Sequence, residues 1–228
     1  MTCFTLNGKP AKSQLPASTR LSDVLRIEMG LPGTKIGCNA GDCGACSVLL
    51  DGAPICSCLT AIAQVEGAAV TSIEGLHAEG TIAKLQDSFL AHGAAQCGIC
   101  TPGMMVAASA LLAENPGPNR QDVEDALGGV LCRCTGYSKI IDAVLAVGGD
   151  ATISPRPQAG QNVGSPIRHL DGQPKVDGSL IYGDDAVPQD ALLVRVIRSP
   201  HHYSSFKIGD KAGLSLIHIS EPTRLSGI

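Results

Sequence analysis

The sequence predicts an α+β protein in which a small sheet comes first and helices follow. Three observations predict this class. Two β-hairpin signals lie within residues 1–76, a glycine-rich cysteine loop separates them, and helical periodicity dominates residues 77–150. The chain has 228 residues, which is long enough for two or three small domains, each with its own core.

Two short turns organise the predicted sheet. Asn7-Gly8 and Asp51-Gly52 are the residue pairs that most strongly favour a two-residue hairpin turn. The predicted strands cover residues 3–6, 11–15, 47–50, 55–57 and 70–73. A helix over residues 21–29, with Thr19 or Ser22 as its N-cap, lies between the first hairpin and the cysteine loop. This order is that of a β-grasp, ferredoxin-like domain.

Four more helices are predicted after the sheet. Apolar residues recur at helical spacing in each of them. Thr101 is the predicted N-cap of the second, before Pro102 at its first position, while Asn119 and Ser138 are the predicted N-caps of the third and fourth. Short helices with short connections predict a small four-helix bundle.

The loop GCNAGDCGAC places Cys38, Cys43 and Cys46 in the Cx4CxxC spacing of plant-type 2Fe-2S sites. Its glycines allow positive φ, which lets backbone N–H groups approach the cluster sulfurs. The spacing leaves open whether Cys56 or Cys58 supplies the fourth thiolate. A zinc site and a disulfide loop are the alternatives, and both are disfavoured because structural zinc usually uses paired CxxC knuckles.

A second group of cysteines lies among the later helices. Cys97 and Cys100 belong to QCGICTPG, and Cys132 and Cys134 to LCRCTGY. Either pair alone would be ambiguous between zinc, a redox dithiol and a metal cluster. Together they predict a second metal centre with four thiolate ligands.

Composition excludes several classes of partner. The net charge is −4 and no run of Lys or Arg occurs, which argues against binding to nucleic acid or to an anionic membrane surface. No apolar stretch is long enough to span a membrane, and no signal-peptide pattern follows the first residues. With ten cysteines, the chain is therefore expected in the reducing cytoplasm.

The four cysteine motifs, taken together, closely resemble the iron–sulfur portion of the molybdenum hydroxylases, the family of xanthine dehydrogenase and aldehyde oxidoreductase. The resemblance covers residues 1–150 and implies a ferredoxin-like 2Fe-2S domain over 1–76 and a helical 2Fe-2S domain over 77–150. It implies that the first cluster is held by Cys38, Cys43, Cys46 and Cys58, and the second by Cys97, Cys100, Cys132 and Cys134.

The resemblance also implies a contact with the molybdopterin cofactor of the complete enzyme. In the family, the residues that match Gln96 and Cys134 lie against its pyranopterin. One departure is Val130, where the family usually has Asn, and this puts a local polar contact in doubt.

Residues 151–163 form a predicted Pro/Gly/Ala-rich linker. Residues 164–213 resemble the start of the molybdenum-binding domain, with its pattern KV.G...Y..D, so the layout resembles that of flavin-free aldehyde oxidoreductases. Residues 214–228 begin with LSLIHISEPTR, which resembles the translation of a sequencing-library adapter. We therefore expect a truncated reading frame whose gene continues into a large molybdenum domain.

The resemblance implies an electron-transfer segment of a molybdenum hydroxylase that oxidises an aldehyde or an N-heterocycle such as a purine. Two 2Fe-2S clusters would carry electrons from the molybdopterin cofactor to an external acceptor, a flavin protein or a ferredoxin-like protein. The missing molybdenum domain is the expected partner, and a homodimer is left open. No catalytic residue lies in this chain, so the fragment alone should be inactive. The alternative function is a stand-alone 2Fe-2S electron carrier.

Overall fold

The computed structural model describes residues 1–76, 80–147, 158–161, 163–165, 167–183, 185–188, 191, 198–207 and 209. The chain divides into two units, Met1–Val187 and Pro188–Ile228. The predicted adapter-derived tail, 214–228, lies outside the described residues. None of the helices in the described part of the chain is both long and apolar enough to cross a membrane.

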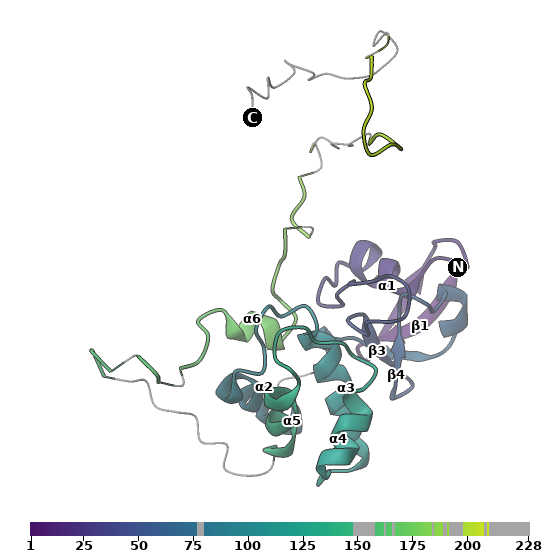
Figure 1. Ribbon diagram of the computed structural model, residues 1–228. Helices are drawn as coiled ribbons and strands as arrows, with labels where there is room; N and C mark the ends of the chain where they lie inside the picture. Colours follow the sequence, from purple (N-terminus) through teal and green to yellow (C-terminus); the bar gives the residue numbers. More distant parts are fainter. Residues whose placement is uncertain are drawn as a thin grey trace. The chain divides into compact units, whose positions relative to one another are not determined.

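A five-stranded sheet forms the first part of the unit Met1–Val187, called the compact unit below (Figure 1). Its strands are β1 (Thr2–Leu6), β2 (Lys9–Ser13), β3 (Ser47–Leu50), β4 (Ala53–Cys56) and β5 (Ala69–Thr71), in the spatial order β2-β1-β5-β3-β4. β1 pairs with β5 in parallel, and the other pairs are antiparallel. Both predicted hairpins are confirmed, and all four of their central turn residues have positive φ.

The predicted first helix is confirmed in place but differs in form. α1 (Leu21–Asp23) continues directly as a π-helical turn, η1 (Val24–Glu28), and both bury their apolar face against the sheet. The predicted N-caps are wrong, because Arg20 occupies the N-cap position and makes no side-chain cap. The hydroxyl of Ser22 is instead buried, with no hydrogen-bond partner among the described residues.

Two short 3-10 helices complete this domain. η2 (Ile62–Val65) buries Ile62 and Val65 in the core beside β1. η3 (Ile73–Gly75) begins where the last strand was predicted to end, so that strand is shorter than expected. Ile73 belongs instead to the core of the helical part, which makes it a link between the two domains.

Among the residues that the structure describes, the helical part contains four longer helices and one short one. They are α2 (Gly80–His92), α3 (Thr101–Glu114), α4 (Arg120–Leu127), α5 (Ser138–Leu145) and α6 (Gly172–Val176). α2 packs on α5 and α3, and α4 packs on α3 and α5. The core includes Phe89, Met104 and Ile140, all fully buried.

Of the predicted helix caps, one is confirmed and two are wrong. The side chain of Asn119 accepts a hydrogen bond of 3.1 Å from the N–H of Asp122, as in a capping box. Thr101 and Ser138 are the first helical residues instead. Their N-caps are Cys100 and Tyr137, so both of these helices begin at a cysteine motif.

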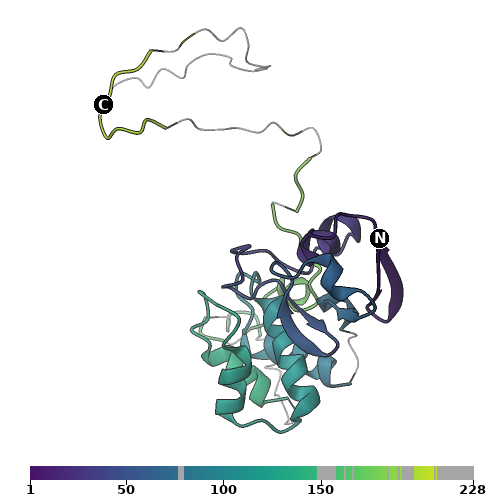
Figure 2. The ribbon, with the colours of Figure 1, turned by 90° about the vertical axis from the view of Figure 1, so that its right-hand side faces the viewer.

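α3 lies beside β3 and β4 as well as against the other helices. Ten of its fourteen residues are therefore buried, including Thr101, Pro102 and Gly103 in its first turn. This position places the start of α3 beside the cysteine loop of the sheet domain. α6 packs on α2 and α3, and the green chain that follows it reaches the purple N-terminal residues (Figure 2). The compact unit consequently extends beyond the predicted linker to Val187.

Candidate metal centres

The first cysteine loop runs without regular secondary structure between η1 and β3 and turns its backbone towards the sulfur atoms. The N–H groups of Ala40 and Cys43 donate to Cys38 Sγ at 3.3 and 3.4 Å, and the N–H of Cys38 donates to Cys43 Sγ at 3.3 Å. These backbone donors lower the pKa of Cys38 to about 7. The loop is therefore built to stabilise sulfur in its anionic form.

Cys46 and Cys58 form a second, inner pair beside this loop. Both are buried and their thiols are hydrogen-bonded to each other, and burial raises the pKa of Cys58 to about 11. The N–H of Gly41 donates to Cys58 Sγ, whereas the Cys56 thiol donates to the carbonyl of Gly41 at 3.7 Å. A thiolate ligand can accept but cannot donate, so the surroundings of Cys58 suit a ligand better than those of Cys56.

The second group of cysteines has the same division into an outer and an inner pair. Cys97 and Cys134 are exposed and hydrogen-bonded to each other, while buried Cys100 is hydrogen-bonded to half-buried Cys132. Burial raises the pKa of Cys97 and of Cys100. Burial also opposes ionisation of Cys132. Hydrogen bonds from Thr135, from the backbone N–H of Cys134 and from the Cys100 thiol together outweigh it and lower the pKa of the Cys132 thiol.

Tyr137 supports this second group from the start of α5. The N–H of Cys132 donates to its hydroxyl oxygen at 2.9 Å, and its own N–H donates to Thr135 Oγ1 at 3.1 Å. Tyr137 has a φ of 67°, a conformation that a bulky residue adopts only when its surroundings enforce it. Sequence reasoning did not assign it a role, although it ends the quoted motif LCRCTGY.

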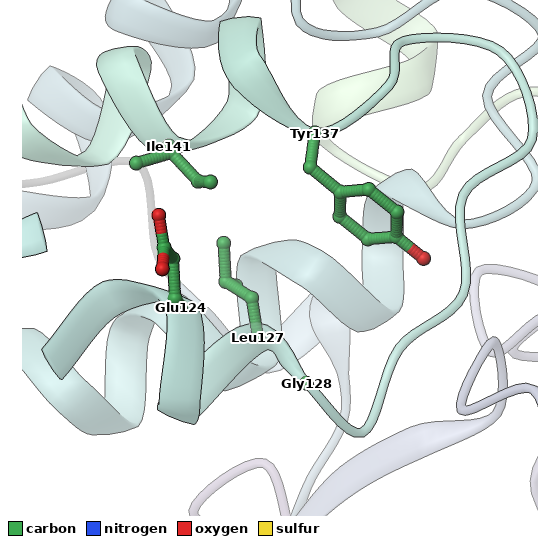
Figure 3. A pocket seen from close by; sticks show the side chains of 5 residues that line it. All are labelled: Glu124, Leu127, Gly128, Tyr137 and Ile141. Carbon is green, nitrogen blue, oxygen red and sulfur yellow. The ribbon is translucent and has the colours of Figure 1, made fainter. Parts of the chain in front are cut away.

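A pocket of about 320 Å³ lies beside Tyr137, between α4 and α5 (Figure 3). The side chains of Leu127 and Ile141 and the carboxylate of Glu124 face one another across it, and the hydroxyl of Tyr137 points away from Glu124. Its walls offer one carboxylate and otherwise mainly apolar surface, which is not enough to orient a polar substrate. This pocket is therefore not a candidate site for a polar substrate.

Each group of four predicted ligands consists of two neighbouring thiol pairs. Among the residues described by the structure, no three or more His, Cys, Asp or Glu side chains are gathered in a way that suits a single metal ion. A 2Fe-2S cluster has two irons and takes four thiolates, hence two for each iron. The donor set and its division into pairs therefore fit such a cluster at both places.

The two cysteine groups are joined by backbone contact. The N–H of Leu131 donates to the carbonyl of Cys43 at 2.9 Å, and Leu131 directly precedes Cys132. A Cβ on Gly44 would lie 2.0 Å from the carbonyl oxygen of Gly129, and Gly44 has a φ of 66°. Glycine is thus required where the loop meets the segment between α4 and α5.

Gln96 and Val130 complete the predicted site. Gln96 is half-buried and directly precedes the exposed Cys97 of the second thiol group. Val130, at the position that departs from the family pattern, is buried in the helical core, and its N–H donates to the carbonyl of Leu127 at 2.9 Å. An apolar side chain therefore suits this position.

Comparison with known proteins agrees with this geometry. Residues 4–71 match the family model of a 2Fe-2S iron-sulfur cluster binding domain, and residues 72–145 match that of a [2Fe-2S] binding domain. The chain is 45% identical, over 140 residues, to the small subunit of nicotine 6-hydroxylase from Paenarthrobacter nicotinovorans, and this match covers 61% of the chain and 84% of that subunit. The chain belongs to the molybdenum hydroxylase family. Its two domains are the iron–sulfur domains of that family.

Aldehyde oxidoreductases from two bacteria match a larger part of this molybdenum hydroxylase chain. Aldehyde oxidoreductase from Megalodesulfovibrio gigas is 37% identical over 220 residues, covering 90% of this chain and 24% of that enzyme. The structure of aldehyde oxidoreductase from Desulfovibrio desulfuricans matches with a TM-score of 0.74 at 38% identity, over 83% of this chain and 22% of the other. This chain thus spans about a quarter of those enzymes.

A shorter relative shows the same iron–sulfur portion. The structure of quinoline 2-oxidoreductase from Pseudomonas putida matches with a TM-score of 0.60 at 47% identity. The match covers 66% of this chain and 91% of the other. The part shared with such shorter chains is therefore the portion that carries both thiol groups.

Proposed function

We propose that this chain is the electron relay of a molybdenum hydroxylase and that it holds two 2Fe-2S clusters. The ligands would be the eight cysteines carried by the family motifs, Cys38, Cys43, Cys46 and Cys58 in the first domain and Cys97, Cys100, Cys132 and Cys134 in the second. The observation that carries this proposal is the arrangement of both groups as two thiol pairs, with backbone N–H groups aimed at the sulfur atoms. A 2Fe-2S cluster supplies one-electron redox chemistry.

The exposed sulfur atoms define where electrons would enter and leave. Cys97 and Cys134 are exposed, and Gln96 directly precedes Cys97, so this side suits a contact with the molybdopterin cofactor of the missing domain. Cys38 is exposed on the first domain and suits transfer to an external acceptor, a flavin protein or a ferredoxin-like protein. The hydrogen bond from Leu131 to Cys43 joins the two domains between these ends.

The complete enzyme would oxidise an aldehyde or an N-heterocycle such as a purine, in a domain beyond this chain. The relatives are named for nicotine, nicotinate, xanthine, caffeine and aldehydes, so the iron–sulfur portion does not choose among these substrates. A stand-alone electron carrier is the weaker alternative. It would not need Gln96 or the segment after the linker, and that segment lies within the long match to aldehyde oxidoreductase.

Reductive titration tests the relay directly. Anaerobic addition of dithionite to the reconstituted chain is expected to take up about two electrons per chain, because each cluster accepts one. The absorbance of the oxidised clusters should bleach in two steps if their potentials differ. Uptake of only about one electron per chain would mean that a single cluster is redox-active, which would contradict the two-cluster relay.

A further inference from the structure

The segment after the linker carries the pattern KV.G...Y..D, whose members are Lys175, Val176, Gly178, Tyr182 and Asp185. All five contact the iron–sulfur domains. We infer that residues 172–183 and Asp185 form an intramolecular clasp across both domains, an inference that rests on the proposed function. We further infer that Tyr182 is a positioning residue for the Cys97–Cys100 turn, and thereby for the second cluster.

One end of the clasp is bound to the first domain by charge. The carboxylate of Asp185 forms an ion pair with Arg26 and lies 3.8 Å from Lys35 Nζ. Lys35 Nζ also donates to the carbonyl of Leu180 at 2.7 Å. The side chains of Asp185 and Lys35 are only 7% and 3% exposed. Water therefore cannot solvate either charge unless the clasp separates from the first domain.

The middle of the clasp is held by close packing. Val176 is fully buried in the helical core, close to Ile73 of the first domain. Gly178 has a φ of 81°, and a Cβ there would lie 2.6 Å from Ile73 Cγ2 and 3.2 Å from Gly33 Cα. The clasp therefore fits against the place where both domains meet.

At the second domain, the clasp covers the turn that carries Cys97. Lys175 is 5% exposed, and its Nζ reaches Asp171 at 2.7 Å. A Cβ on Gly98 would lie 2.8 Å from Lys175 Cγ and 2.5 Å from the hydroxyl oxygen of Tyr182. Gly98 has a φ of 93°. Glycine is therefore required both by the backbone conformation and by the close contact with Lys175 and Tyr182.

The hydroxyl of Tyr182 donates to the carbonyl of Cys97 at 2.8 Å. Because the peptide group is planar and trans, fixing this carbonyl also fixes the direction of the N–H of Gly98. The same turn directs the N–H of Ile99 to Cys97 Sγ, and the N–H of Thr101 donates to the carbonyl of Gly98 at 3.2 Å. Hydrogen bonds around cluster sulfurs set the reduction potential, so losing this hydroxyl should alter the second cluster alone.

The test is Tyr182→Phe in the full chain, reconstituted anaerobically and studied by electron paramagnetic resonance during a redox titration. We expect shifted g-values for the second cluster and a several-fold lower ratio of reduced to oxidised second cluster at a fixed applied potential. The signal of the first cluster should not move. Tyr203→Phe is the matched control, because Tyr203 is 96% exposed, and it should match the wild type in both signals.

A Tyr182→Phe protein with four irons and both signals unchanged would overturn the inference while leaving the relay intact. A wild-type chain without two signals would instead contradict the proposed function. If Tyr182→Phe loses iron, Asp185→Asn is the deciding variant. It keeps the hydroxyl of Tyr182 but removes the ion pair with Arg26 at the other end of the clasp. The inference then predicts a shifted second-cluster signal, and a wild-type signal would refute it.

Discussion

Cys58→Ser is expected to remove the first cluster and to leave the second, so that iron falls from about four to about two atoms per chain. Cys58 is 1% exposed and lies beside Cys46, and its Sγ accepts a hydrogen bond from the N–H of Gly41. A serine hydroxyl keeps its proton at neutral pH and is a poor ligand for iron in this setting. Iron analysis and paramagnetic resonance of the reduced protein measure the effect.

Cys56→Ser is the matched control, only two residues away. The Cys56 thiol donates to the carbonyl of Gly41, and a serine hydroxyl can do the same. This variant should keep about four irons per chain, with both signals. Loss of the first cluster in Cys56→Ser and its survival in Cys58→Ser would move the ligand to Cys56.

Gly44→Ala is expected to destabilise the junction between the two domains by about 3 kcal/mol, from positive-φ strain together with backbone overlap. The added Cβ would lie 2.0 Å from the carbonyl oxygen of Gly129 and 2.9 Å from Val130 Cα. These atoms belong to the backbone, so no side-chain rotation relieves the overlap. Unfolding in guanidinium, followed by circular dichroism and by cluster absorbance, measures the loss.

Gly30→Ala separates the two causes. Gly30 has the same φ, 66°, but a Cβ there meets nothing within 4 Å. It should lose only the conformational contribution, about 1 kcal/mol. Equal destabilisation by the two substitutions would mean that the contact between Gly44 and Gly129 adds nothing to the stability of the junction.

The features that the sequence predicts well are local ones. Asn7-Gly8 and Asp51-Gly52 determine their turns through φ values that few other residues adopt, so both hairpins are confirmed. Asn119 caps α4 because its side chain accepts from the backbone N–H of Asp122 and the side chain of Asp122 accepts from the backbone N–H of Asn119. Such signals need no knowledge of the rest of the chain.

Prediction is less accurate where tertiary packing determines the local structure. Thr101 has the side chain of an N-cap, yet it is 1% exposed and lies inside α3, because the turn at Cys97–Cys100 starts the helix one residue earlier. Ser138 is displaced in the same way by Tyr137, whose hydroxyl is engaged with Cys132. In both places the cysteine motif, and not the capping preference, determines where the helix begins.

Long-range contacts lie beyond what the sequence alone predicts. The motif spacings single out seven cysteines, and the family resemblance adds Cys58. Spacing does not show which thiols form pairs or that Tyr182 reaches Cys97, 85 residues away. The pattern KV.G...Y..D was the available signal for the clasp. The family resemblance places this pattern at the start of the molybdenum-binding domain, and its contacts with the iron–sulfur domains follow only from the fold.

Metal content is the measurement that tests the two-cluster relay most directly. Anaerobically reconstituted chain is expected to contain about four irons and about four acid-labile sulfides, two of each for every 2Fe-2S cluster. On reduction it should show two distinct paramagnetic signals, only one of which survives in Cys58→Ser. About two irons per chain with a single signal, or stoichiometric zinc without labile sulfide, would contradict the account.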